Sequence, residues 1–143
     1  MDIRPLAEGY AVSPQIAPED AAELAARGFR VVICNRPDSE NPPDLQADAV
    51  RAAVEAAGMR FVLNDFAGPG MTPDHIAAQG AALEAAEGPV LAYCASGTRS
   101  TVVWALSQAG RLPAAQMIDA AARQGYQIAG LQPKIEELAA ARG

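Results

Sequence analysis

Short apolar runs alternate along the chain with stretches whose apolar residues recur at helical spacing. Runs at residues 29–34, 60–63 and 89–93 predict strands, the last of them buried, and residues 10–12 predict a short edge strand. Spacing and end signals predict helices over residues 18–27, 45–57, 73–86, 99–109, 113–123 and 133–142. This alternation predicts an α/β fold in a single domain, residues 1–143, with a mostly parallel central sheet flanked by helices.

Three loops follow the carboxyl ends of the predicted strands, at residues 35–43, 64–71 and 94–99. All three are polar or rich in glycine and proline. Parallel sheets bind ligands beyond the carboxyl ends of their strands, so we expect the functional site where these loops meet. Loops are polar in most proteins, but that alone does not explain why the loops richest in polar residues, glycine and proline share one end of the sheet.

The loop after the last predicted strand carries the most specific chemistry. Cys94 ends that strand, and Arg99 opens the following helix. Backbone N–H groups and the helix dipole at such a position favour negative charge, so they favour a nucleophilic thiolate at Cys94. Arg99 adds a planar, permanently charged group suited to the oxygens of an anion. The anion cradle is expected to comprise the amides of Ala95, Ser96, Gly97 and Thr98.

This loop resembles the reactive loops of two enzyme families. Protein tyrosine and dual-specificity phosphatases have five residues between cysteine and arginine, and rhodanese-type sulfurtransferases commonly have four. Four residues separate Cys94 from Arg99. The shorter loop has fewer amides and a tighter radius, which suits a persulfide sulfur better than a phosphoryl group.

Two further motifs accompany the loop: Asn-Arg-Pro-Asp-Ser-Glu at residues 35–40 and Gly-Tyr-Gln-Ile-Ala-Gly-Leu at residues 125–131. In this order the three motifs are similar to landmarks of the bacterial beta-lactamase-hydrolase-like, phosphatase-like domain family, which is also labelled a sulfur transferase family. The resemblance implies a dual-specificity-phosphatase-like fold with four or five mostly parallel strands. It also implies that some relatives are fused to a persulfide dioxygenase module, a partner that favours sulfur chemistry.

The chain departs from these patterns at three places. Ala95 stands where many relatives have arginine, which removes a positive group. Tyr93 stands where phosphatases have histidine, which removes a partner of the thiolate. Residues 64–66, Asn-Asp-Phe, replace the Pro-Val that commonly follows that strand in the family.

Three functions are consistent with these residues, and we rank them in the following order. As a sulfurtransferase, Cys94 takes a sulfane sulfur, carries it as a persulfide and passes it to a thiol acceptor such as glutathione or a protein cysteine. As a phosphatase, Cys94 forms a phosphocysteine. The third function is a non-catalytic sensor of an anion or a sulfur species. In the two enzymatic cases Arg99 and the loop amides stabilise the developing charge.

Several residues have supporting roles with two interpretations each. Ser100 donates a hydrogen bond to the Cys94 sulfur, or it satisfies the backbone at the helix start. Asp65 lies 29 residues before Cys94, about where phosphatases place their general acid, or it stabilises a turn. Arg36 assists anion binding with Asp38 orienting it, or the two form an internal pair that shapes the loop.

Three other residues are expected to serve the structure. Cys34 ends a neighbouring strand, so a disulfide with Cys94 requires their Cα atoms within about 7 Å; a buried, unreactive thiol is the preferred interpretation. His75 is expected near a helix cap rather than at a catalytic position. Trp104 is spaced as a core residue.

Composition disfavours several classes of function. The net charge is −6 and Lys134 is the only lysine, which argues against nucleic-acid and anionic-membrane partners. No apolar run reaches transmembrane length, and residues 1–5 lack the pattern of a signal peptide. Two cysteines make no disulfide framework, and one histidine without zinc-type spacing makes no metal site. We therefore expect a cytoplasmic protein that needs no cofactor.

Overall fold

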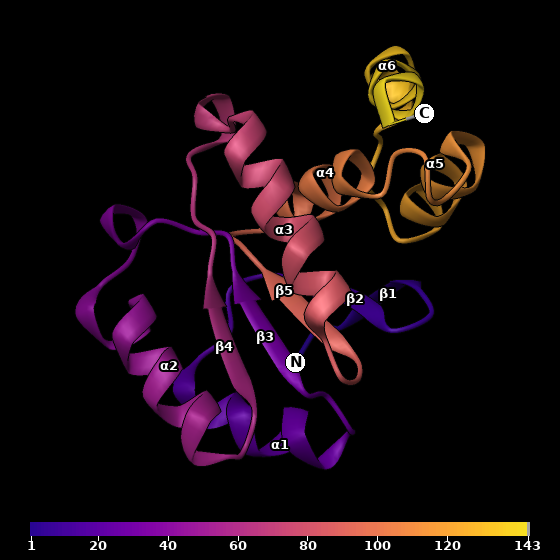
Figure 1. The fold of residues 1–143 in the computed structure, drawn as a ribbon. Helices are drawn as coiled ribbons and strands as arrows, with labels where there is room; N and C mark the ends of the chain where they lie inside the picture. The colour runs from indigo at the N-terminus through magenta and orange to yellow at the C-terminus, as the bar shows by residue number, and fades with distance from the viewer. Residues whose placement is uncertain (143) are drawn as a thin grey trace.

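The computed structural model describes residues 1–142 and contains one five-stranded sheet (Figure 1). The strands are β1 (Arg4–Ala7), β2 (Tyr10–Ser13), β3 (Val31–Cys34), β4 (Arg60–Leu63) and β5 (Val90–Tyr93). Their order is β1-β2-β5-β3-β4, and every neighbouring pair is parallel except β1 with β2. The central strands β3 and β5 are buried throughout because helices cover both faces. This arrangement confirms the predicted α/β fold.

Six α-helices pack around the sheet within residues 1–142. They are α1 (Ala21–Ala26), α2 (Ala47–Ala56), α3 (Pro73–Ala85), α4 (Thr98–Ser107), α5 (Ala114–Arg123) and α6 (Gln132–Arg142). In Figure 1, α1 and α2 lie together on one side of the sheet and α3 and α4 on the other, while α5 and α6 pack against α4. The longest of these helices has 13 residues, and none of them is long and apolar enough to cross a membrane.

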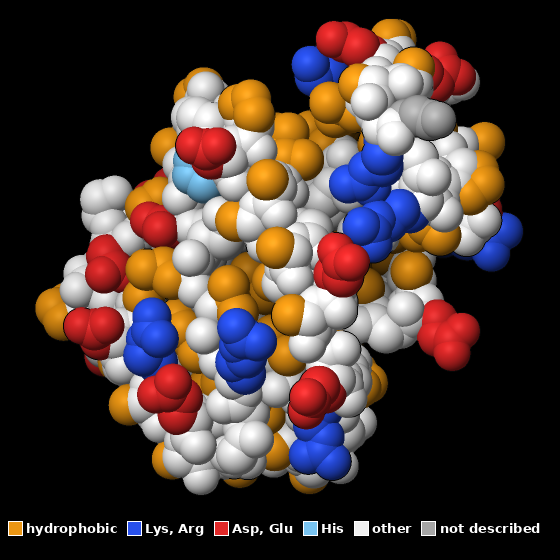
Figure 2. Space-filling view, viewed as in Figure 1, with side chains coloured by type: hydrophobic (Ala, Val, Ile, Leu, Met, Phe, Trp, Pro, Cys, Tyr) orange, Lys and Arg blue, Asp and Glu red, His pale blue; other side chains and the backbone are white. Residues whose placement is uncertain are grey.

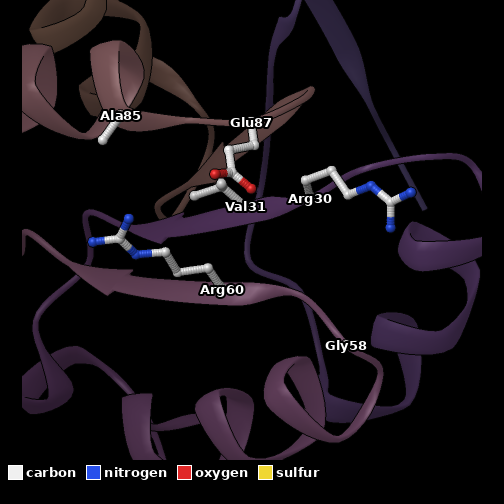
Figure 3. Close-up of a pocket in the computed structure, with 6 residues that line it drawn as sticks. All are labelled: Arg30, Val31, Gly58, Arg60, Ala85 and Glu87. Carbon is white, nitrogen blue, oxygen red and sulfur yellow. The ribbon is translucent and has the colours of Figure 1, made fainter.

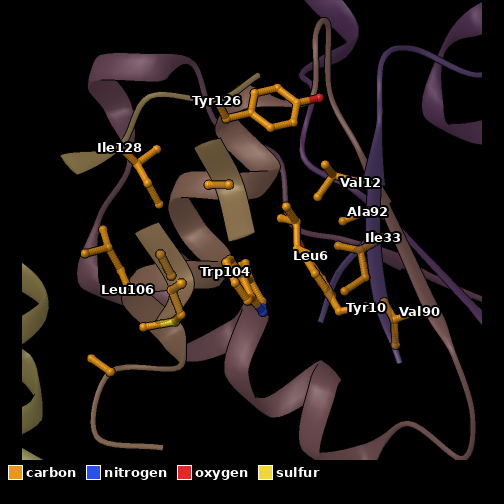
Figure 4. Packing of buried hydrophobic residues seen from close by; sticks show 14 of the residues in the cluster. Leu6, Tyr10, Val12, Ile33, Val90, Ala92, Trp104, Leu106, Tyr126 and Ile128 are labelled. Atoms are coloured by element: carbon orange, nitrogen blue, oxygen red, sulfur yellow. The ribbon is translucent and has the colours of Figure 1, made fainter. Parts of the chain in front are cut away.

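Two apolar clusters form the core, one on each face of the sheet. Successive residues of a strand point to opposite faces, so Ile33 belongs to one cluster and its neighbour Val32 to the other. Trp104 of α4 stacks on Tyr10 of β2, with ring centroids 5.7 Å apart and an angle of 9° between the planes (Figure 4). The expected core position of Trp104 is therefore confirmed.

The main difference from the predicted elements is at the start of the chain. Residues 10–12 belong to β2, which is not at the edge of the sheet, because β1 pairs with β2 and forms the edge itself. The sequence of β1 gives a weak strand signal, since Pro5 lacks the N–H that most strands use and Arg4 interrupts the apolar pattern. Gly9, with a φ of +80°, makes the tight turn that joins β1 to β2. The predicted helix at 18–27 begins instead as a 3₁₀ turn over Pro18–Asp20.

Truncation of Leu91 should strongly destabilise the fold. Leu91 lies in the central strand β5 and has no exposed surface. Leu91→Ala should lower the free energy of unfolding by about 2–5 kcal/mol because it leaves a cavity. Leu63→Ala is the matched control, since Leu63 ends β4 and is 46% exposed. Urea unfolding of both variants measures the difference, and equal losses would contradict this account of the core.

Candidate active site

Cys94 directly follows β5, in the loop that joins this strand to α4. The Gly97 N–H donates a hydrogen bond to Cys94 Sγ, with an N···S distance of 3.1 Å. Gly97 is the N-cap of α4 and has a φ of +96°, a conformation that favours glycine. The loop therefore directs a backbone N–H at the sulfur from the amino end of a ten-residue helix, where negative charge is stabilised.

The remaining residues of the predicted cradle lie on the open side of the loop. Ala95, Ser96 and Thr98 are exposed, whereas Cys94 and Gly97 are buried. The Ala95 carbonyl accepts a hydrogen bond from the Gln15 N–H at 3.3 Å. The hydroxyls of Ser96 and Thr98 lie 3.0 Å apart. The loop is thus anchored where it leaves the sheet and accessible to a ligand further along.

Arg99 is held at one end of its guanidinium group. Nη1 donates to Glu40 Oε2 at 3.0 Å and to the Phe66 carbonyl at 3.1 Å, and Nη2 donates to Glu40 Oε1 at 2.8 Å. An arginine has five N–H donors, and these hydrogen bonds use three of them. The two that remain are on Nε and Nη2, and Cys94 is a further hydrogen-bonding neighbour of the group. Hydrogen bonding to Glu40 raises the pKa of Arg99, and the neighbouring Cys94 adds to this effect. One bidentate edge of the guanidinium is therefore available to an anion beside Cys94.

Glu40 is a functional residue that sequence reasoning missed. Its carboxylate bridges Arg99 and Arg36, whose Nε donates to Oε1 at 3.1 Å. Hydrogen bonding by Arg99 lowers the pKa of Glu40, and Arg36 lowers it further. The position of Glu40 in the 35–40 motif, at the reactive end of the sheet, is the signal that could have identified it.

The structure separates the two residues that the sequence suggested as an internal pair. Arg36 uses three nitrogens to bind the Glu40 side chain, the Glu40 carbonyl and Gln15. Asp38 does not pair with Arg36; its Oδ1 accepts from the Ala47 N–H at 2.8 Å, at the start of α2. Both residues shape the 35–43 loop, and Arg36 also touches the carboxylate that holds Arg99.

Ser100 does not donate to Cys94, because its hydroxyl hydrogen is directed at Asn35. Ser100 Oγ lies 2.8 Å from Asn35 Oδ1, and Asn35 Nδ2 donates to Gln79 Oε1 at 3.0 Å. Gln79 Nε2 contacts the Tyr10 hydroxyl at 3.2 Å, and that hydroxyl donates to the Ser100 carbonyl at 2.9 Å. These four buried side chains, Ser100, Asn35, Gln79 and Tyr10, form a closed hydrogen-bonded ring, which we call the Gln79 ring.

Asn64 connects the third loop to the same ring. Its Nδ2 donates to Gln79 Oε1 at 2.9 Å and to the backbone carbonyl of His75 at 2.9 Å. The backbone carbonyl of Asn64 accepts a hydrogen bond from Asn35 Nδ2. Sequence reasoning missed Asn35, Asn64 and Gln79. The available signal was that Asn35 and Asn64 occupy equivalent places, each directly after a parallel strand.

Asp65 lies at the same end of the sheet, in the loop that contacts Arg99. The next residue, Phe66, is buried and provides the carbonyl that accepts from Arg99. Asp65 is half-buried. Burial is the main cause that raises the pKa of the Cys34 thiol, and the charge of Asp65 adds to it.

Cys34 has the environment of an unreactive thiol. It is buried, its Sγ donates to the Arg36 carbonyl at 3.3 Å, and burial raises its pKa. Cys34 is in register with Tyr93, so these two side chains share a face and the next residue, Cys94, points away from it. Both cysteines are free, and the disulfide considered from the sequence is absent.

His75 completes the start of α3 and does not contact the cysteine loop through its ring. Its Nδ1 accepts a hydrogen bond from the Thr72 N–H at 3.0 Å, as its expected place near a helix cap requires. In the described part of the chain, no group of three or more histidine, cysteine or acidic side chains has the geometry to hold a metal ion.

A hollow of about 570 Å³ lies at the opposite end of the sheet, near the amino ends of β3 and β4. Arg30, Arg60 and Glu87 line it, but Figure 3 shows the two arginines pointing in opposite directions. The face shown in Figure 2 mixes acidic and basic side chains without a continuous patch of one sign. Neither the hollow nor this face offers a set of donors that converge as those around Cys94 do.

The Glu40–Arg99 ion pair should make stability depend on acid pH. The folded-state pKa of Glu40 lies below its ordinary value of 4.5, so its contribution is complete above that value and is lost as the pH falls through the folded-state pKa. Glu40→Gln should reduce the free energy of unfolding at pH 7 by up to about 1 kcal/mol and have less effect near pH 3. Urea unfolding at both pH values is the measurement. Glu84→Gln, which breaks an exposed pair with Arg111, is the control, and a pH-independent effect of Glu40→Gln would contradict the prediction.

The comparison with family models matches residues 2–111 to the "Beta-lactamase hydrolase-like protein, phosphatase-like domain" family. A beta-lactamase hydrolase-like protein from Xylella fastidiosa is 36% identical over 108 residues, or 76% of this chain. One from Agrobacterium fabrum is 33% identical over 130 residues, or 90% of this chain. The matches cover only 25% and 30% of these relatives, so this chain spans less than a third of their length.

Solved structures of phosphatases share the fold. A candidate phosphatase from Neisseria meningitidis is 28% identical with a TM-score of 0.81, covering 96% of this chain and 99% of that one. PTPMT1, at 14% identity and a TM-score of 0.75, covers 99% of this chain and 100% of its own. The Neisseria structure favours the phosphatase alternative, whereas the likeness to PTPMT1 shows the fold alone. Neither structure supports sulfur transfer, the function that we ranked first from the sequence. Because the family model covers most of the chain, the chain belongs to the family of the beta-lactamase hydrolase-like protein, phosphatase-like domain.

Proposed function

We propose that this domain is a cysteine-dependent phosphatase that hydrolyses phosphomonoesters through a phosphocysteine at Cys94. One observation carries the proposal: the sulfur that accepts from the Gly97 N–H lies beside an arginine with its other end fixed by Glu40. A planar guanidinium with a free bidentate edge matches two oxygens of a phosphoryl group. The phosphatase name of the Neisseria structure supports the same chemistry.

The reaction proceeds in two displacements. The Cys94 thiolate attacks phosphorus, an S–P bond forms, and the P–O bond to the leaving group breaks. The leaving oxygen takes a proton, for which we propose Asp65 as the donor because its loop contacts Arg99 through Phe66. Water then attacks phosphorus and gives a proton to the Asp65 carboxylate, the S–P bond breaks, and inorganic phosphate leaves with the thiolate regenerated. Arg99 and the loop amides stabilise the phosphoryl oxygens in both steps.

Sulfur transfer is the competing function, and the four-residue spacing between Cys94 and Arg99 favours it. In that reaction Cys94 accepts a sulfur atom from a donor such as thiosulfate, and a thiol removes it. The two functions leave different atoms on the same sulfur, so the mass of the intermediate distinguishes them.

Acid quenching during turnover of p-nitrophenyl phosphate should trap a phosphorylated protein. Intact-mass analysis should detect one phosphoryl group on the wild type and none on Cys94→Ser, which should also lose hydrolysis. Cys34→Ser is the matched control, because the Cys34 thiol is buried and unreactive in our account. Gain of one sulfur atom from thiosulfate without phosphate hydrolysis would replace the proposed function with sulfur transfer.

Asp65→Asn should slow the hydrolysis of esters with poor leaving groups. A general acid contributes about 10²–10⁴-fold, and its loss matters most when the leaving oxygen must be protonated. We expect kcat for phenyl phosphate to fall far more than kcat for p-nitrophenyl phosphate. Asp74→Asn, at an exposed position in the first turn of α3, should change neither. An equal fall for both esters would reject Asp65 as the acid.

A further inference from the structure

The 125–131 motif brings a tyrosine from beyond α5 back to the cysteine loop. Tyr126 is 5% exposed and belongs to the core cluster shown in Figure 4. Its hydroxyl donates to the Ser96 carbonyl at 2.9 Å. Residue 126 lies outside residues 2–111, which the family model matches. The contact therefore joins the C-terminal part of the chain to the loop that carries Cys94.

The Ser96 carbonyl and the Gly97 N–H belong to the same peptide group. The described residues contain no cis peptide bond, and in a trans peptide the carbonyl and the N–H point in opposite directions. Tyr126 holds the oxygen on one side of this peptide. The N–H on the other side then points at Cys94 Sγ, 3.1 Å from the nitrogen.

We propose that Tyr126 is a positioning residue that fixes the Ser96–Gly97 peptide so that its N–H faces the Cys94 sulfur. The proposal rests on the proposed function for its effect on turnover, but the effect on the thiol is independent of it. Rotation of this peptide by half a turn would bring the carbonyl oxygen toward the sulfur. A thiolate next to that oxygen would lose a donor and gain a repulsive contact.

The orientation of the Ser96–Gly97 peptide needs to be fixed because residue 97 is a glycine. Glycine reaches many backbone conformations, so a peptide beside it reorients more easily than others. On its carboxyl side the Gly97 carbonyl is held by Thr101, through the side-chain hydroxyl at 2.8 Å and the N–H at 3.0 Å. On its amino side the holding group is Tyr126. A β-carbon at residue 97 would collide with the Tyr126 hydroxyl, which shows how closely the tyrosine covers the glycine.

Tyr126 is itself held in a defined place. The Arg4 guanidinium lies over its ring, 5.2 Å from the centroid, and Arg4 Nη1 donates to the Gln124 carbonyl at 3.0 Å. The charged groups that face the phenol are Arg4, with Asp2 paired to it, and the Cys94 sulfur. Burial raises the pKa of Tyr126 above its ordinary value of 10.0, so the hydroxyl remains a donor throughout the neutral range.

The test removes the Tyr126 hydroxyl and follows the reactivity of the Cys94 thiol. In a Cys34→Ser background, where iodoacetamide reports on Cys94 alone, Tyr126→Phe should slow alkylation across the neutral pH range. The rate at pH 7 should fall about three- to tenfold, because the variant weakens part of a hydrogen bond to a charged group. Turnover of p-nitrophenyl phosphate should fall by a similar factor in kcat/KM.

Tyr93→Phe is the matched control, since the Tyr93 hydroxyl is buried without a hydrogen-bond partner in the described structure. Like Tyr126→Phe, this variant removes only a phenolic hydroxyl, here from the residue next to Cys94 in the chain. It should leave the alkylation profile unchanged. Identical profiles for Tyr126→Phe and Tyr93→Phe would overturn the proposal. Slower alkylation in a protein without phosphatase activity would keep the role of Tyr126 and reject the proposed function.

A second measurement covers the case in which Tyr126→Phe unfolds. In the Cys34→Ser protein, the Gly97 amide resonance in ¹⁵N NMR should shift with pH in step with the ionisation of Cys94, because this N–H donates to the sulfur. A Gly97 resonance that does not respond to that ionisation would overturn the proposal without any change at residue 126.

Discussion

The reactive end of the sheet depends on buried polar side chains that satisfy one another out of contact with water. Gln79 is fully buried and connects Asn35, Asn64 and Tyr10. A buried polar group that loses its partner costs about 1–3 kcal/mol, so each member of the Gln79 ring holds the others in place. Fully satisfied networks of this kind rigidify the surrounding structure. The ring and Asn64 thus fix three loops that lie far apart in the sequence.

The ring positions residues of the candidate site because its members are their neighbours in the chain. Asn35 precedes Arg36, Asn64 precedes Asp65, and Ser100 follows Arg99. The ring sets the backbone positions, and Glu40 then sets the direction of the Arg99 guanidinium. Glu40 also neutralises part of the positive charge of the two arginines. An anion bound as we propose would therefore be recognised through the direction of the donors more than through net charge.

The sequence allowed most of the architecture to be predicted, because buried strands such as β3 and β5 are continuous apolar runs with clear ends. It also identified the cysteine loop, because Cys94 and Arg99 are close in the chain. It could not identify Gln79, which lies 15 residues from Asn64 and 44 from Asn35. A glutamine inside a helix normally faces water, and only the pairing of three loops shows that this one does not. The role of Ser100 was predicted incorrectly for the same reason, since its acceptor, Asn35, is 65 residues away.

A loop with only four residues between cysteine and arginine has few amides, so the direction of each one matters more than in a longer loop. In this chain the two peptide groups that flank Gly97 are held by side chains from different elements. Thr101 is in α4, next to the loop, whereas Tyr126 follows α5, 30 residues from its acceptor Ser96. Residues 112–142 therefore do more than extend the matched domain. They contribute one of the hydrogen bonds that determine the shape of the loop around Cys94, and Arg4 at the other end of the chain holds that contribution in place.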